Sequence, residues 1–125
     1  MTEVNRATHC TRPWGEWFVL HEEPGYKVKK LVLTPGMATS LQYHFNRDEY
    51  WTIVSGNGEL YRDYSRVNFL GRYTVPVGPG DQYDIPREAI HRIKNTGTEP
   101  LVIIEVWVGG ETSEEDVVRL DYGEI

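Results

Sequence analysis

Apolar and polar residues alternate along most of this chain, in short runs that end at glycine, proline or asparagine. The runs that read as strands are 16–20, 26–34, 49–54, 58–64, 72–77, 91–95 and 101–109. Branched and aromatic side chains with a period of two residues are typical of β-strands. Turn-forming residues separate the runs at near-regular intervals, as in a sandwich or a barrel of antiparallel strands. The pattern therefore predicts an all-β fold, with sandwich and barrel as alternatives.

Three local patterns predict features between and after these strands. Asn57 and Gly58 form a tight-turn signal, so we expect 58–64 to be the strand that returns from 49–54. Ser113 with Asp116 resembles a capping box, which predicts a short C-terminal helical turn. The polar and aromatic stretch 61–73 is interpreted as an extended hairpin or a mobile flap, near the barrel mouth or at a subunit contact.

Length and composition bound the class of protein. The chain has 125 residues, of which 39% are hydrophobic, so we expect a single globular domain over 1–125. One cysteine, Cys10, allows neither an internal disulfide nor a cysteine metal cluster. That usage favours a cytoplasmic protein. No run of apolar residues approaches the length of a membrane span, so we expect no membrane contact.

The net charge restricts the partners. A formal charge of −6 argues against a nucleic-acid binder, which needs a basic face. A small anionic ligand stays compatible, because a cationic pocket can form locally on an acidic protein.

Four residues form a candidate metal site. Gln42 and His44 are two apart, so on a strand they share one face. Glu49 begins the next strand, and if the two strands are adjacent and antiparallel, all three side chains point into one space. His91, at the start of 91–95, is the candidate for the missing ligand.

This donor set favours one class of metal ion. An amide oxygen, two imidazoles and one carboxylate suit a single divalent transition metal, with zinc first and manganese, nickel, cobalt or iron as alternatives. Because only Glu49 is anionic, the ion would keep Lewis acidity towards a carbonyl or hydroxyl. The competing interpretation is that each histidine is structural or surface-exposed, and we assign no metal role to His9 or His21.

The spacing of these residues resembles the two cupin motifs. The first motif is matched by Gly36, Gln42, His44, Glu49 and Gly56, with glutamine where many cupins have a histidine. The second is matched by Gly80, Pro86, His91 and Asn95, with Glu88 in place of its usual glycine.

A closer resemblance covers residues 12–123. The blocks RPWGEW, YKVKKLVLTPG, SLQYHFNRDEYW, IPREAIHRIKN, LVIIEVWVG and EEDVVRLDYG are similar to successive blocks of the type II mannose-6-phosphate isomerase domain. In many bacteria that domain follows a GDP-mannose pyrophosphorylase domain. No glycine-rich nucleotide loop is visible here, so we expect no pyrophosphorylase activity from this sequence.

The resemblance implies a fold, a reaction and a site. It implies a double-stranded β-helix, or jelly roll, with Gln42, His44, Glu49 and His91 as metal ligands and Arg47 as a catalytic residue. The implied reaction interconverts mannose 6-phosphate and fructose 6-phosphate through a cis-enediol. By analogy with other cupins, the resemblance also suggests a homodimer.

Other site residues are less constrained. The sugar phosphate needs cations, and Lys29, Arg92 and Arg119 are candidates for substrate binding, with a solvated surface charge as the alternative for each. The general base is not identified: Tyr50, Tyr83, Asp84 and a metal-bound hydroxide are all open.

Departures from the family pattern keep two other functions open. Phe45 and Asn46 replace two family histidines, and Tyr50 replaces a third. These changes favour a cupin that binds a sugar or sugar phosphate without turnover. Another metal-dependent cupin enzyme, such as a dioxygenase or an epimerase, is the second alternative.

Overall fold

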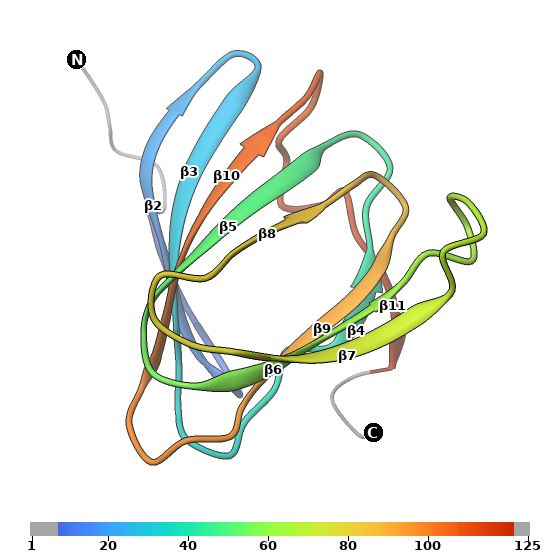
Figure 1. Cartoon of the computed structure of the whole chain (residues 1–125). Coiled ribbons are helices and arrows are strands. Elements are labelled where there is room, and N and C mark those ends of the chain that lie inside the picture. Colours follow the sequence, from blue (N-terminus) through green and yellow to red (C-terminus); the bar gives the residue numbers. More distant parts are fainter. Residues whose placement is uncertain (1–7, 122–125) are drawn as a thin grey trace.

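The computed structural model describes residues 8–121, which fold into two antiparallel sheets that face each other (Figure 1). The six-stranded sheet contains, in spatial order, β1 (His9–Arg12), β2 (Gly15–Glu23), β3 (Tyr26–Leu33), β10 (Leu101–Val108), β5 (Asp48–Ser55) and β8 (Gln82–Ile85). The five-stranded sheet contains β11 (Val118–Asp121), β4 (Leu41–Tyr43), β9 (Ile90–Asn95), β6 (Gly58–Asp63) and β7 (Arg72–Val77). This interleaved order confirms the predicted all-β jelly roll.

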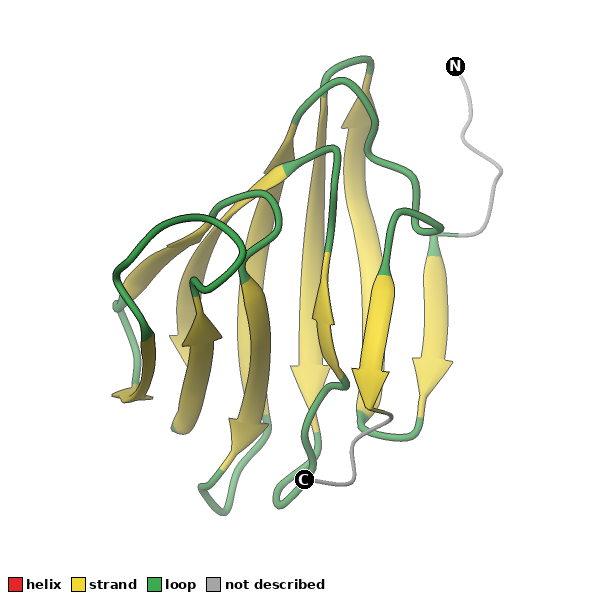
Figure 2. Ribbon diagram, turned by 90° about the vertical axis from the view of Figure 1, so that its right-hand side faces the viewer, coloured by secondary structure: helices red, strands yellow, loops and turns green. Residues whose placement is uncertain are grey.

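The predicted C-terminal helical turn is wrong. Residues 8–121 contain strands and loops but no helix, as Figure 2 shows, and hence no helix that could cross a membrane. The Ser113 hydroxyl accepts a hydrogen bond from the backbone N–H of Glu115, which closes a turn instead of opening a helix. The Asp116 carboxylate bonds to distant backbone groups, and β-branched Val118 begins strand β11.

The predicted hairpin between β5 and β6 is also wrong. β6 pairs with β7 and β9 in the other sheet, so residues 56–57 carry the chain across the sandwich. Gly56 has φ of 89°, and a Cβ there would lie 2.5 Å from the carbonyl oxygen of Pro100. The predicted tight turn at Asn57 and Gly58 is displaced, because the chain bends at Gly56 and Gly58 already begins β6. Close backbone approach, not strand pairing, requires the glycine at position 56.

Apolar side chains fill one end of the space between the sheets. The fully buried members are Leu33, Ile53, Leu60, Ile85, Ile93, Leu101 and Ile103. Alternation along β3 points Lys27, Lys29, Leu31 and Leu33 inward. The inner surface of this strand therefore changes from apolar to charged towards its start, where the interior becomes polar.

The stretch 61–73 is an extended hairpin. β6 and β7 pair from Gly58 to Asp63, and the loop between them projects from the barrel (Figure 1, yellow-green). Tyr64 is buried, whereas Phe69 at the loop is fully exposed. The guanidinium of Arg66 lies 2.9 Å from a Glu88 oxygen and 4.2 Å from the Tyr43 ring centre. These contacts hold the loop against the turn that leads into β9.

Candidate metal centre

Three predicted ligands converge between the two sheets. Nitrogen and oxygen atoms of His44, Glu49 and His91 all lie within 4.8 Å of one another, and all three side chains are buried. His44 directly follows β4 and His91 lies in β9, so both come from the five-stranded sheet. Glu49 lies in β5 of the six-stranded sheet. The expectation that Gln42, His44 and Glu49 come from two adjacent strands is wrong, because β4 and β5 belong to different sheets and contribute to the cluster from opposite sides.

The fourth predicted ligand, Gln42, lies in the same cavity as this cluster. It is in β4 and is the sheet partner of His91 in β9. Side chains of paired residues project from the same face of a sheet, so Gln42 and His91 both point to the interior.

Hydrogen bonds at Nδ1 orient both imidazoles. The ring of His44 bonds through Nδ1 to the carbonyl oxygen of Asp116 at 2.7 Å, and His91 Nδ1 to that of Ala89 at 3.0 Å. Because a carbonyl oxygen only accepts, each Nδ1 carries the proton and each Nε2 keeps a lone pair. Burial lowers the pKa of His44 to about 3 and also lowers the pKa of His91. Both rings are therefore neutral at pH 7, which is the form that binds a metal.

Glu49 supplies the negative charge of the cluster. Burial by itself would raise its pKa, but His44 and Arg47 outweigh burial and hold the pKa below its usual value. Its Oε2 accepts from Arg47 Nε at 2.8 Å, and its Oε1 from Trp51 Nε1 at 2.9 Å. An ionised carboxylate beside two neutral imidazoles fits a divalent transition metal.

Arg47 is buried against this cluster. Besides its bond to Glu49, its Nη2 lies 3.3 Å from His44 Nε2, and its Nη1 donates to the Ser113 carbonyl oxygen at 3.1 Å. The guanidinium carbon lies 3.3 Å from the ring centre of Trp107. Arg47 thus contacts the candidate ligand atoms of Glu49 and His44 directly, a proximity that its place in the sequence does not reveal.

One cavity of about 520 Å³ is lined by Arg47 and by all four predicted ligands. It is also lined by Lys29, Arg92 and Arg119, the three cations predicted for substrate binding. Two further cations, Arg12 and Lys94, lie on its wall and were missed by the sequence analysis. The volume is in the usual range for a small-molecule site.

Lys29 is the most enclosed of the predicted substrate-binding cations. Its ammonium lies 3.8 Å from the ring centre of Trp17 and 4.4 Å from that of Trp107. It also donates to Glu114 Oε1 at 2.9 Å. Burial lowers its pKa, against the charges of Glu114 and Glu105. Lys29 is therefore an internal cation of the cavity, not a solvated surface charge.

The side-chain candidates for the general base lie elsewhere. None of Tyr50, Tyr83 and Asp84 lines the cavity. Tyr50 is half exposed, Asp84 is exposed, and the Tyr83 hydroxyl donates to the Pro76 carbonyl oxygen. A buried carboxyl that the sequence analysis did not single out, Glu105, does line the cavity.

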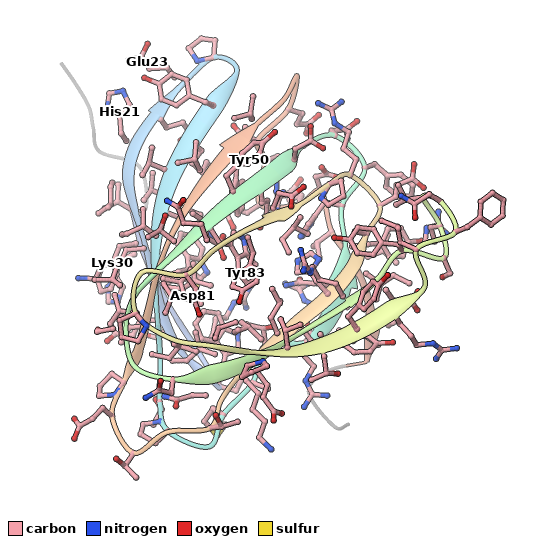
Figure 3. All side chains as sticks on the ribbon, in the orientation of Figure 1. His21, Glu23, Lys30, Tyr50, Asp81 and Tyr83 are labelled. Atoms are coloured by element: carbon pink, nitrogen blue, oxygen red, sulfur yellow. The ribbon has the colours of Figure 1, made fainter. Side chains whose placement is uncertain are left out.

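The two histidines that received no metal role are on the surface. His9 Nε2 lies 2.6 Å from Glu16, and His21 Nε2 lies 2.7 Å from Glu23. Figure 3 shows His21 and Glu23 at the outer end of the β2–β3 hairpin, far from the space between the sheets.

Comparison with known proteins gives one family. The family described as "Mannose-6-phosphate isomerase C-terminal" matches residues 1–122. A mannose-1-phosphate guanylyltransferase from Salmonella muenchen is 32% identical over 119 residues, which are 95% of this chain and 24% of that protein. The alginate biosynthesis protein AlgA of Pseudomonas putida is 33% identical over 96% of this chain and 23% of its own length. The chain therefore spans about a quarter of these relatives.

Solved structures share the fold at low identity. The capsular polysaccharide assembling protein CapF from Staphylococcus aureus superposes with a TM-score of 0.76 at 21% identity, over 90% of this chain and 34% of that one. Oxalate decarboxylase from Bacillus subtilis, described with Mn(II) centres, gives a TM-score of 0.75 at 21% identity, over 87% of this chain and 29% of that one. At these identities the likeness supports a common cupin fold and nothing finer.

Proposed function

Because the chain belongs to the family of mannose-6-phosphate isomerase C-terminal domains, we propose that it is a metal-dependent isomerase of mannose 6-phosphate and fructose 6-phosphate. The observation that carries the proposal is the convergence of His44, Glu49 and His91 in one cavity with Gln42 and Arg47. This arrangement provides donors for an ion and a cation beside it in a space that fits a small sugar.

The donors suit one divalent ion held by Gln42, His44, Glu49 and His91. Zinc is the first choice, and manganese, nickel, cobalt and iron accept the same donor types. When bound, such an ion supplies Lewis acidity to the carbonyl and hydroxyl oxygens of the sugar.

Arg47 is proposed to stabilise the oxygen charge of the enediolate. Its guanidinium is fixed by Glu49, the Ser113 carbonyl and the Trp107 ring, so a substrate oxygen meets a donor that is already oriented. A preoriented cation in a site shielded from water stabilises developing charge more than a mobile one.

Two of the remaining cations of the cavity are proposed to bind the phosphate. Arg92 and Arg119 lie on β9 and β11, and Arg119 is the sheet partner of Gln42. Guanidinium groups bind phosphate through paired donors, which suits these two residues. Lys29, already paired with Glu114, is placed to contact the sugar hydroxyls.

The departures from the family pattern leave this cavity untouched. Phe45, Asn46 and Tyr50 are exposed, and none of them lines the cavity. Phe45 instead packs on Tyr43, with ring centres 5.4 Å apart. The substitutions that favoured a binding cupin without turnover therefore do not alter the walls of the site, which supports the catalytic proposal.

A coupled assay tests the proposal. Purified protein is stripped with a chelator, restored with each candidate ion, and supplied with mannose 6-phosphate while fructose 6-phosphate is measured. We expect turnover in the restored protein and none in the stripped protein. Binding of mannose 6-phosphate by metal-loaded protein without turnover would instead establish the sugar-phosphate-binding alternative. If the metal-loaded protein neither binds nor converts mannose 6-phosphate, both the isomerase and the binding alternative are contradicted.

A further inference from the structure

Glu105 is a carboxyl group placed where an apolar side chain is expected. It lies in β10, the strand between β3 and β5 in the six-stranded sheet. Alternation along β10 points Leu101, Ile103, Glu105 and Trp107 inward, and Glu105 is 3% exposed. A buried carboxyl without an ion-pair partner in hydrogen-bond contact is costly, so a role beyond packing is expected.

The position of Glu105 in the sheet brings it close to the metal cluster without joining it. Its sheet partners are Lys29 on one side and Trp51 on the other. Glu49 is two residues from Trp51 on the same face of β5, so Glu49 is the diagonal neighbour of Glu105. Diagonal neighbours have Cα atoms about 7–8 Å apart. A substrate bound at the cluster would therefore lie within reach of Glu105.

One oxygen of Glu105 is left open to the cavity. Its Oε1 accepts from Trp107 Nε1 at 2.9 Å, the one hydrogen bond to this carboxyl among the described residues. The second oxygen has no hydrogen-bond partner among residues 8–121. It is nevertheless not a fully enclosed atom, because the sole enclosed side-chain polar atom without a partner in these residues is Nε of Arg62. The second oxygen of Glu105 is therefore accessible from the cavity, which this residue lines.

The two carboxyls of the cavity have opposite environments. Burial, and then the nearby charge of Glu49, raise the pKa of Glu105 to about 8. Glu49, in contrast, is held ionised beside His44 and Arg47. When two neighbouring carboxyls differ in this way, the ionised one suits electrostatic work and the other suits proton transfer.

Resting on the isomerase function proposed above, we infer that Glu105 is the acid–base residue that moves the proton between C2 and C1 of the sugar. The ionised form of Glu105, which is the minor form at neutral pH, takes the C2 proton of the open-chain aldose. The C2–H electron pair forms the C1=C2 bond, and the C1=O π pair moves to O1. The carboxyl then returns its proton to C1 while the O2 proton passes to O1. No oxidant or co-reactant is consumed, and Glu105 ends as it began.

Glu105→Gln is the direct test, because the amide keeps the size of the side chain and an oxygen for the Trp107 indole. We expect kcat for mannose 6-phosphate to fall by about 10²-fold or more, the usual contribution of a general acid–base group. Metal content and calorimetric binding of mannose 6-phosphate should stay at wild-type values. Deuterium uptake at C1 and C2 in D₂O should fall together with kcat. Glu99→Gln, an exposed change at a residue that does not line the cavity, is the matched control.

The possible outcomes distinguish a failure of this inference from a failure of the proposed isomerase function. If wild-type protein converts mannose 6-phosphate and Glu105→Gln converts it equally well, the inference is wrong and the isomerase function stands. If Glu105→Gln loses metal or substrate binding along with turnover, Glu105 is structural and the inference is again wrong. If wild-type protein with bound metal converts nothing, the proposed function fails first, without reference to any variant.

Discussion

The imidazole of His44 donates a hydrogen bond through Nδ1 to the backbone oxygen of Asp116, 2.7 Å away and 72 residues later in the chain. The same aspartate accepts from the backbone N–H groups of Phe45 and Asn46 at 3.0 and 2.9 Å. The turn before β11 therefore holds the segment that carries His44 and Arg47. The bond to the Asp116 carbonyl oxygen fixes the orientation of the His44 ring beside Glu49 and His91.

Replacing Asp116 by alanine should weaken metal binding while the ligands remain. The variant leaves two backbone N–H groups without their acceptor, so the His44 segment loosens. Residues that orient metal ligands typically change affinity by about 10–100-fold when replaced. A competition titration against a chelator measures this effect. The exposed neighbour Glu115→Ala is the control, and equal metal affinity in both variants would show that the Asp116 contact orients nothing.

Removing a ligand should affect metal and turnover together. His91→Ala deletes a buried imidazole of the cluster, and we expect metal content after dialysis to fall to a small fraction of the wild-type value. Gln42→Ala deletes a neutral, weaker donor and should cost less affinity. Elemental analysis of both variants provides the measurement. Full metal content in His91→Ala would remove this residue from the ligand set.

Arg47→Ala should separate metal binding from turnover. Arginine is not a ligand, so at saturating metal we expect wild-type content. The value of kcat/KM should fall by about 10²-fold or more, which corresponds to about 3 kcal/mol of transition-state stabilisation. Arg47→Lys keeps the charge but loses the paired donors, and should recover little of the activity. Wild-type kinetics in either variant would contradict the role given to this guanidinium.

The raised pKa of Glu105 predicts a pH dependence of stability. In the unfolded chain this carboxyl loses its proton near pH 4.5, whereas in the folded protein it keeps the proton up to about pH 8. Between these values the folded state binds more protons, so the contribution of Glu105 to stability falls as pH rises. Glu105→Gln cannot ionise. Its stability relative to the wild type should therefore increase from pH 4.5 to 8 in metal-free protein, as measured by urea unfolding. A constant difference would show that the folded pKa is not raised.

Strand positions followed well from the alternation of residues, but strand partners did not. The predicted run 72–77 coincides with β7 from Arg72 to Val77. The turn after Ser55 was found, yet its following strand joins the opposite sheet. A glycine-containing turn specifies a change of direction, while long-range pairing decides which sheet receives the chain.

The convergence of His44, Glu49 and His91 could be predicted from their spacing and the family resemblance. Lys29 was among the predicted substrate-binding cations, whereas Glu105 and Asp116 were not predicted to line or support the site. Lys29 and Glu105 face inward because of the two-residue period of β3 and β10, a signal present in the sequence but masked by their charge. Asp116 reaches His44 only through the fold. Glu88 replaces a motif glycine and has φ of 66°. The backbone at this position is therefore left-handed, although glutamate adopts this conformation less readily than glycine.

Titration of metal-free protein with a divalent ion, while mannose 6-phosphate and fructose 6-phosphate are interconverted, tests the central claim most directly. If His44, Glu49, His91 and Gln42 hold one catalytic ion, activity in both directions should rise linearly and stop at one ion per chain. Activity that is absent at every metal occupancy, or unchanged by stripping and restoring the ion, would contradict a metal-dependent isomerase.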